Sequence, residues 1–368
     1  MSGTKFGGLT RCTHVVPENV TQQHKWCIIS IMDVEKIMIP KQRITIPMMQ
    51  LDERVRINQQ QVERVAKVIK HLAEVQPFNY ATNSHPPVGH ASTLDYFFAV
   101  TLQQFGFWED DGKQYVRPMI AQMDGKALKG SAYMAKAYLR VLDTDSQFYS
   151  PARQTIIQKD ELLKIFRSDS GHNPIPAFDL HLRLANKFGQ DMLALDLSPL
   201  EVVNRVNAKK KPLRAFLQML DTISGYKEDP LSKKANLLAM ILIQRPENFL
   251  SIGSNENLLP IVDYHCMRVC LRLGLIDVIN SSLSRKLIYR QLVTTDEEWA
   301  VRLAAYQIQP LIKEISGKSI GAINQFFFKY MRSRCHEMIS PECNGCITDQ
   351  VCLRRKQYFQ PVLRTTNY

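Results

Sequence analysis

The sequence lacks the long apolar runs that membrane proteins need. No window approaches the roughly 18 apolar residues of a membrane-spanning helix, and the longest comparable run, residues 237–243, suits only a buried helix. The opening MSGTKFGG has no apolar stretch of the kind found in a signal peptide. Glycine and proline occur in ordinary numbers, which excludes collagen-like and low-complexity chains. We therefore expect a cytoplasmic protein that does not enter a membrane.

The composition is that of a large, basic globular chain. Its 368 residues are 45% hydrophobic, enough for two lobes or one large domain. The chain has 47 Lys and Arg against 35 Asp and Glu, a net charge of +12. This surplus favours a polyanionic partner such as DNA or RNA, and a basic protein without such a partner is the alternative. Nothing in the composition predicts a protein partner.

The pattern of residues divides the chain into three parts. Residues 1–57 are expected to form an extension with short strands at 26–32 and 43–47. Residues 58–333 have helical periodicity almost throughout, with Pro and Gly at the joints, and form a helical core. Residues 334–368 hold a cysteine-rich loop and a basic tail. Helices are expected near 130–143, 159–167, 176–188, 198–206, 211–223, 231–243, 263–273, 284–293, 296–315 and 319–333. The fold class is therefore mainly α.

Four of the eight cysteines crowd into the last 35 residues. Cys335, Cys343, Cys346 and Cys352 have the spacing C-x7-C-x2-C-x5-C. Four thiolates so close in sequence can converge on one metal centre, and both zinc and an iron–sulfur cluster accept such a set. The alternative is a surface loop with unliganded thiols, which would expose oxidisable groups.

One aspartate and one lysine have the setting of catalytic residues. Asp263 opens a largely apolar helix, and Lys233 opens another about thirty residues earlier. A carboxylate in that position is ordinarily an N-cap that accepts free backbone N–H groups. Taken alone, the capping role explains Asp263.

The catalytic stretch and the cysteine loop together resemble helix-hairpin-helix DNA glycosylases. Val-Asp-x-His at Asp263, Lys-x-Ala-Asn at Lys233 and the cysteine spacing are similar to endonuclease III and the MutY-type adenine glycosylases. That family uses C-x6-C-x2-C-x5-C for a 4Fe–4S cluster, and here the first spacer is one residue longer. The glycine-rich hairpin LPGVG is absent, and residues 223–227 stand in its place. The resemblance implies a two-lobe helical bundle, a catalytic segment at 231–275 and a cluster bound by the four cysteines.

The middle of the chain resembles a second family, the queuosine salvage proteins. The similarity spans roughly residues 60–315 and includes Phe107-Trp108, Gly125-Lys126 and the run IFRSDSG at 165–171. That family consists of nucleotide N-glycosylases on the same helical scaffold and has no cysteine loop. Its catalytic Asp in the motif Asp-Tyr-Arg falls on Asp263, which is followed here by Tyr264 and His265. Both resemblances select the same aspartate.

These resemblances give the remaining candidates their roles. Asp263 would stabilise positive charge on the sugar or activate the attacking water. Lys233 would form a Schiff base with C1′ or serve as a fixed charge. Phe107 and Trp108 would stack on an extruded base, or form a core aromatic pair. Asp179 would contact a base edge, or lie on a helix surface.

Two basic runs are candidates for phosphate contact. They are Lys209, Lys210 and Lys211, and Arg354, Arg355 and Lys356. A solvated basic face is the alternative for the second run.

Taken together, the sequence predicts a DNA glycosylase that flips out and excises a modified or damaged base, for example a bulky base of the phage type. The first alternative is a nucleotide glycosylase that releases a 7-deazaguanine-type base. The second is a non-catalytic nucleic-acid-binding protein.

Overall fold

The structure is a computed structural model that describes residues 49–338 and 340–368. The described residues belong to one compact unit, Gln42–Tyr368. Helices far outweigh strands among these residues, which confirms the prediction of a mainly α fold. The strands expected at 26–32 and 43–47 lie outside the described residues. The boundaries at residues 57 and 333 stay predictions.

The helices follow one another along the described chain, and most begin within a few residues of the predicted positions. They are α1 (Gln59–His71), α2 (Thr93–Thr101), α3 (Ser131–Leu142), α4 (Pro151–Thr155), α5 (Lys159–Phe166), α6 (Phe178–Ala194), α7 (Pro199–Asn207), α8 (Pro212–Leu220), α9 (Lys233–Gln244), α10 (Tyr264–Leu273), α11 (Ser281–Ile288), α12 (Thr295–Ser316), α13 (Ile320–Gln325), the π-helical η2 (Phe326–Tyr330) and α14 (Met331–Arg334).

The strands of the described chain form three antiparallel pairs, which add little to the core. They are β1 (Val55–Ile57) with β6 (Ile276–Val278), β2 (Trp108–Asp110) with β3 (Tyr115–Pro118), and β4 (Ile120–Met123) with β5 (Lys126–Lys129). The first pair joins segments far apart in sequence and ties α1 to the end of α10. No helix in the described part of the chain combines the length and the apolar character that crossing a bilayer requires.

Local sequence signals explain where several helices start and stop. Ser198 and Thr294 each accept a backbone N–H three residues on, and the glutamates at those positions bond back, so α7 and α12 begin with capping boxes. Gly274 and Gly317 end α10 and α12 with φ of 81° and 70°. That conformation favours glycine because it has no Cβ.

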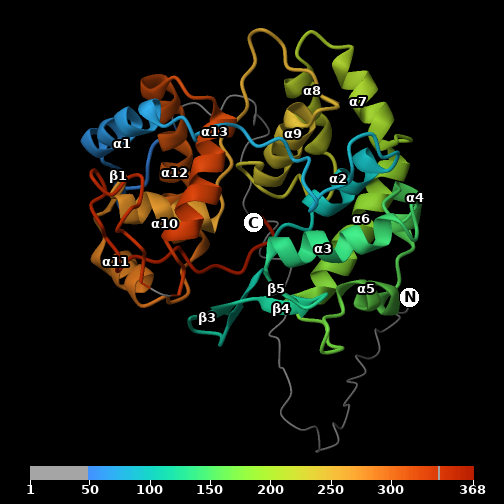
Figure 1. Ribbon diagram of the computed structural model, residues 1–368, viewed down its shortest axis with the longest axis horizontal. Coiled ribbons are helices and arrows are strands. Elements are labelled where there is room, and N and C mark those ends of the chain that lie inside the picture. The colour runs from blue at the N-terminus through green and yellow to red at the C-terminus, as the bar shows by residue number, and fades with distance from the viewer. Residues whose placement is uncertain (1–48, 339) are drawn as a thin grey trace, which may run out of the picture. The chain divides into compact units, whose positions relative to one another are not determined.

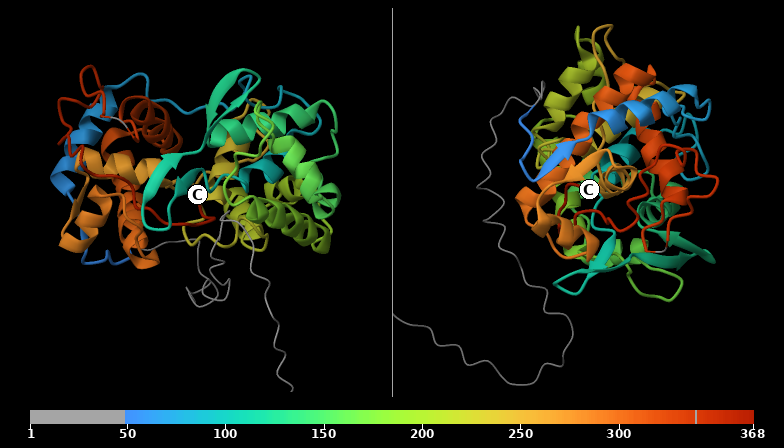
Figure 2. Two further views of the ribbon diagram at one scale, coloured as in Figure 1. Left: turned by 90° about the horizontal axis from the view of Figure 1, so that it is seen from below. Right: turned by 90° about the vertical axis from the view of Figure 1, so that its left-hand side faces the viewer.

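The buried apolar side chains of the described residues form two large clusters. The first cluster draws on α2 to α9, and the second draws on α1, α10 to η2 and the C-terminal tail. Figures 1 and 2 show the same division, with α1 and α10 to α13 grouped apart from α2 to α9. The fold therefore has two packing centres.

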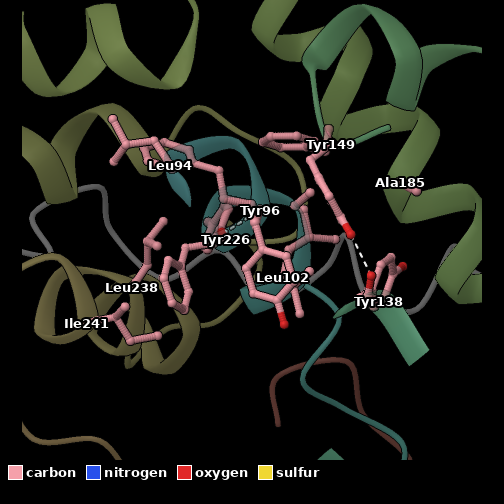
Figure 3. Close-up of a cluster of buried hydrophobic side chains, with 14 of the residues drawn as sticks. Leu94, Tyr96, Leu102, Tyr138, Tyr149, Ala185, Tyr226, Leu238 and Ile241 are labelled. Carbon is pink, nitrogen blue, oxygen red and sulfur yellow. Dashed lines mark hydrogen bonds between the residues drawn. The ribbon is translucent and has the colours of Figure 1, made fainter. Parts of the chain in front are cut away.

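The first cluster is rich in tyrosines, and all but one of their hydroxyls donate to backbone carbonyls. The exception among the described residues is the hydroxyl of Tyr138, which has no partner. In Figure 3 the Tyr149 hydroxyl donates to the backbone carbonyl of Tyr138, and the hydroxyl of Tyr226 donates to the carbonyl of Phe98 at 2.6 Å. Tyr96 packs edge-on against Tyr149 with ring centroids 5.2 Å apart. Cutting such a buried ring back to alanine typically costs about 3–5 kcal/mol. These rings give α2 and α9 a rigid support.

The start of α9 lies where the two clusters meet. Leu231, just before the helix, belongs to the second cluster, whereas Ala235 and Leu238 belong to the first. Residues between them are therefore placed at the junction. Lys233 is one of these residues, and α10, which carries Asp263 at its start, packs in the second cluster.

Candidate active site

Lys233 is the first residue of α9 and is buried, with 6% of its surface exposed. Its backbone N–H donates to Asp229 Oδ2 at 2.6 Å, and its amine donates to the carbonyl of Gln104 at 3.4 Å. Burial lowers the pKa of Lys233 below its ordinary value, and the carboxylates of Asp263 and Asp229 oppose that shift. The residue before it, Ser232, has a left-handed φ of 51°, a strained conformation for serine.

Asp263 is the N-cap of α10. It has an extended backbone, and its Oδ1 accepts the N–H of Cys266 at 2.9 Å. Every residue of α10 is buried, whereas Asp263 itself is half-buried. No described residue donates a hydrogen bond to its Oδ2. The carboxylate therefore caps the helix with one oxygen and still acts on the amine of Lys233.

The structure thus places the two predicted catalytic residues within electrostatic range of each other. They start two helices that belong to different clusters, and thirty residues separate them in sequence. A buried amine beside a half-buried carboxylate is an arrangement found at functional sites more often than at structural ones.

A buried network of ionic side chains lies next to Lys233 and bonds to its backbone. Arg302 donates from Nη2 to Asp229 Oδ2 at 2.7 Å, and Glu298 lies 3.8 Å from its Nε. All three side chains are at most 3% exposed. Burial alone would raise the pKa of Asp229, but the charge and hydrogen bond of Arg302 hold it below its usual value. Burial raises the pKa of Glu298.

A second lysine, Lys234, holds the turn at 102–107. Its amine donates to the carbonyl of Leu102 at 3.0 Å and lies 5.2 Å from the ring centre of Phe105. Burial lowers the pKa of Lys234 to about 7. The ring of His181 stacks on the ring of Phe105, with the ring centres 4.1 Å apart. Burial lowers the pKa of His181 to about 3.

No contact described for the predicted base-binding residues reaches Lys233 or Asp263. Phe107 is 4% exposed in the first cluster, where Gly130 approaches so closely that a Cβ there would lie 3.0 Å from the Cβ of Phe107. Trp108 is half-buried and packs near Tyr115 with ring centroids 5.8 Å apart. Asp179 lies in the first turn of α6 with 75% of its side chain exposed.

The predicted phosphate-binding residues lie in two exposed loops. Lys209, Lys210 and Lys211 are exposed between α7 and α8. Arg354 pairs with Asp349 at 2.7 Å, and Arg355 pairs with Asp277 at 2.7 Å, while Lys356 is exposed. Two members of the second run are therefore engaged within the protein.

The four cysteines lie after α14, and the thiols of three of them form hydrogen bonds with the chain around them. Arg272 donates to the sulfur of Cys335 at 3.5 Å, and the N–H of Arg354 donates to that of Cys352 at 3.3 Å. Among residues 49–338 and 340–368, no three His, Cys, Asp or Glu side chains are grouped so that they could hold a metal ion. The structure gives no support for the predicted 4Fe–4S cluster at Cys335, Cys343, Cys346 and Cys352, or for zinc in its place.

The sequence analysis did not identify the residues of the buried ion network. Asp229 and Arg302 are 73 residues apart, so no local motif joins them. A signal was present in α12, where Glu298 and Arg302 stand one turn apart in an apolar stretch. Charged residues at that spacing inside an apolar helix indicate a buried ion pair rather than a solvated face.

Comparisons with known proteins show that Lys233 and Asp263 lie inside a segment that matches a known family. The sequence model of the family described as queuosine salvage protein matches residues 84–324. These residues include Lys233 and Asp263, but neither the cysteine loop nor the C-terminal tail.

Two curated relatives are similar to the chain, and both are named queuosine 5'-phosphate N-glycosylase/hydrolase. The protein from Schizosaccharomyces pombe is 22% identical over 266 residues, which are 66% of this chain and 75% of that one. The protein from Nematostella vectensis is 25% identical over 113 residues, which are 30% of this chain and 32% of that one.

These matches correct the main prediction. Both relatives are named for a nucleotide substrate, so the expectation of a DNA glycosylase acting in base excision is wrong. The helix-hairpin-helix and iron–sulfur assignment has no support from them either. The first alternative, a glycosylase that acts on a nucleotide, is the interpretation that they favour.

Proposed function

The chain belongs to the queuosine salvage protein family, and on that premise we propose that this N-glycosidase hydrolyses queuosine 5'-phosphate. The products would be the free 7-deazaguanine-type base and ribose 5-phosphate. The names of the two relatives support the substrate. The single structural observation that carries the proposal is the burial of Lys233 within electrostatic range of Asp263, at the junction of the two clusters and inside the matched segment.

Asp263 has the chemistry that the reaction requires. When the bond between C1′ and the base nitrogen breaks, positive charge builds on the sugar, and a carboxylate nearby stabilises it. A water oxygen then bonds to C1′. One of the water's protons stays on this oxygen as the C1′ hydroxyl of ribose 5-phosphate, and the other passes, directly or through the carboxylate, to the nitrogen of the departing base. Because Oδ1 of Asp263 is held by the N–H of Cys266, we assign the contact with the sugar or the water to Oδ2.

Lys233 serves this reaction as a fixed positive charge. Its amine is directed to the carbonyl of Gln104 and lies under the influence of Asp263 and Asp229. These contacts fix the position of the amine and of the carboxylate that it faces. A Schiff base with C1′ belongs to a lyase, whereas both relatives are named as hydrolases, so the charge is the role that we propose.

Trp108 is the half-buried aromatic residue of the predicted pair, so we propose it, and not the core residue Phe107, as the ring nearest to the base. A flat ring supports a flat base by stacking, which is typically worth about 1–3 kcal/mol for each base.

The proposal is tested by measuring base release from a small set of substrates. The purified protein is incubated with queuosine 5'-phosphate, with the unphosphorylated nucleoside, with guanosine 5'-phosphate and with duplex DNA, and free base is determined by mass spectrometry. We expect release from queuosine 5'-phosphate, with an equal amount of ribose 5-phosphate. Release from DNA alone, or from none of the four, would refute the proposal.

A further inference from the structure

The C-terminal tail, residues 359–368, lies outside the segment that the family model matches and yet reaches the candidate site. The N–H of Phe359 donates to the carbonyl of Leu287 at 3.1 Å, and that of Val293 donates to the carbonyl of Val362 at 3.0 Å. The tail therefore runs beside α11 and the start of α12. Figures 1 and 2 mark its end between the helices of the two clusters.

Tyr368 makes three contacts at that end, and it is 3% exposed. Its hydroxyl donates to Glu298 Oε1 at 2.8 Å. Its ring centre lies 5.0 Å from the guanidinium carbon of Arg302 and 6.1 Å from the ring centre of Tyr264, the residue after Asp263. The hydroxyl of Tyr368 bonds to a carboxylate and its ring faces a cation, and an apolar ring of the same volume would lack the hydrogen bond. Tyr368 therefore does more than fill space.

Arg302 is the residue through which these contacts reach the pair. Its Nη2 donates to Asp229 Oδ2, the same oxygen that accepts the backbone N–H of Lys233. Its Nε donates at 3.4 Å to the carbonyl of Val262, the residue before Asp263. One guanidinium therefore bonds to both segments that carry the candidate catalytic residues. Any shift of Arg302 would move the start of α9 relative to the start of α10.

We infer that Tyr368 is a positioning residue of the glycosidase, which fixes Glu298 and Arg302 and thereby sets the spacing between Lys233 and Asp263. The inference rests on the proposed function and adds to it a part of the chain that the family match does not include. Tyr368 itself does not touch the substrate, because it is buried behind the network.

The test compares two phenylalanine variants, one at the end of the tail and one at the residue just before it. Tyr368→Phe keeps the ring and removes the hydroxyl bonded to Glu298. Tyr358→Phe is the matched control, since that buried hydroxyl bonds only to Ser284 Oγ at 3.1 Å among the hydrogen bonds described for it, away from the network. For Tyr368→Phe we expect kcat for release of base from queuosine 5'-phosphate to fall about tenfold, because small displacements of reacting groups are costly. We expect KM to change less than about twofold.

The pH profile separates positioning from simple loss of stability. The hydroxyl of Tyr368 favours the charged form of Glu298, which also faces Arg302 and Asp229. Without the hydroxyl the pKa of Glu298 rises, so the acid limb of the kcat profile should move to higher pH in Tyr368→Phe and stay in place in Tyr358→Phe.

The outcomes are distinct. A Tyr368→Phe enzyme with the wild-type kcat and pH profile overturns the inference and leaves the proposed function standing. Equal losses in the two variants also overturn it, because the effect would then come from tail packing in general. A wild-type protein that releases no base from the nucleotide refutes the proposed function and this inference together.

Discussion

The replacement of Asp263 by asparagine separates its catalytic role from its structural one. Asparagine is as good an N-cap as aspartate, and its side-chain oxygen can still accept the N–H of Cys266. The change therefore keeps the start of α10 and removes the negative charge. Alanine at the same position removes both the charge and the cap.

The structure sets the size of each effect. Asparagine gives up the attraction between a negative charge and the helix N-terminus, about 0.3–1 kcal/mol, and alanine gives up roughly 1 kcal/mol more for the lost cap. We expect Tm to fall by about 1–2 °C for Asp263→Asn and by about 2–4 °C for Asp263→Ala. Losing a charge that stabilises the transition state costs about 4 kcal/mol, or roughly 10³-fold in kcat.

The assay is release of base from queuosine 5'-phosphate at saturating substrate, together with thermal unfolding of the same preparations. Both variants should lose activity to the same extent while differing in Tm. If Asp263→Asn keeps kcat within tenfold of wild type, the carboxylate is only a helix cap and the proposed mechanism is wrong. If Tm decreases by the same amount in the two variants, the capping argument itself fails.

Three further predictions concern the surroundings of the pair. Burial lowers the pKa of Lys234 from 10.5 to about 7, so the unfolded chain binds this proton between these two pH values and the folded chain does not. The stability of wild type relative to Lys234→Met should therefore rise from pH 7 to pH 10.5. Measurements of Tm for both proteins at pH 7 and pH 9.5 will show this rise. Arg302→Met leaves the carboxylate of Asp229 buried without its cation, and urea unfolding should report a loss of about 3–5 kcal/mol, whereas a loss below 1 kcal/mol would contradict the buried ion pair. Asp179→Ala should leave KM within about twofold of wild type, because this exposed side chain pairs only loosely with Lys159 at 3.6 Å; a tenfold rise in KM would restore it as a base-binding residue.

Helix positions were predictable wherever apolar periodicity and a cap occur together. The stretch predicted at 296–315 is α12 (Thr295–Ser316), where Thr294 and Glu297 form a capping box. The prediction at 284–293 was displaced, because Asn280 caps α11 by accepting the N–H of Leu283 at 2.9 Å and so starts that helix at Ser281. The five-residue α4 was missed, since so short a helix carries too little periodicity to detect.

The positions of Lys233 and Asp263 at helix starts were predictable from local sequence, whereas the residues that support them were not. The catalytic roles of the two residues came from the family resemblances and stay predictions. Asp229 and Arg302 meet only after the chain has folded, and Tyr368 joins them from the far end of the sequence. Contacts of this kind depend on which helix faces are buried together, and a single sequence does not specify that.

The prediction of DNA binding failed because charge was counted without its partners. Arg354 and Arg355 looked like a phosphate-binding run, yet Asp349 and Asp277 each bond to one of them. A net charge of +12 describes the whole chain and not a surface. A metal at the four cysteines stays a prediction, because spacing fixes how thiols could converge on a metal and not whether they bind one.

The two interpretations of Asp263, helix cap and catalytic carboxylate, are compatible, and the second gains from the first. A carboxylate free to rotate would have to be ordered when substrate binds, and that ordering would reduce the rate. Here the N–H of Cys266 holds Oδ1 at 2.9 Å, so the direction of Oδ2 is set before substrate arrives. The positive end of the α10 dipole also stabilises negative charge at this position. In the proposed mechanism, capping would therefore be the means by which α10, buried along its whole length, presents a rigid carboxylate to the sugar.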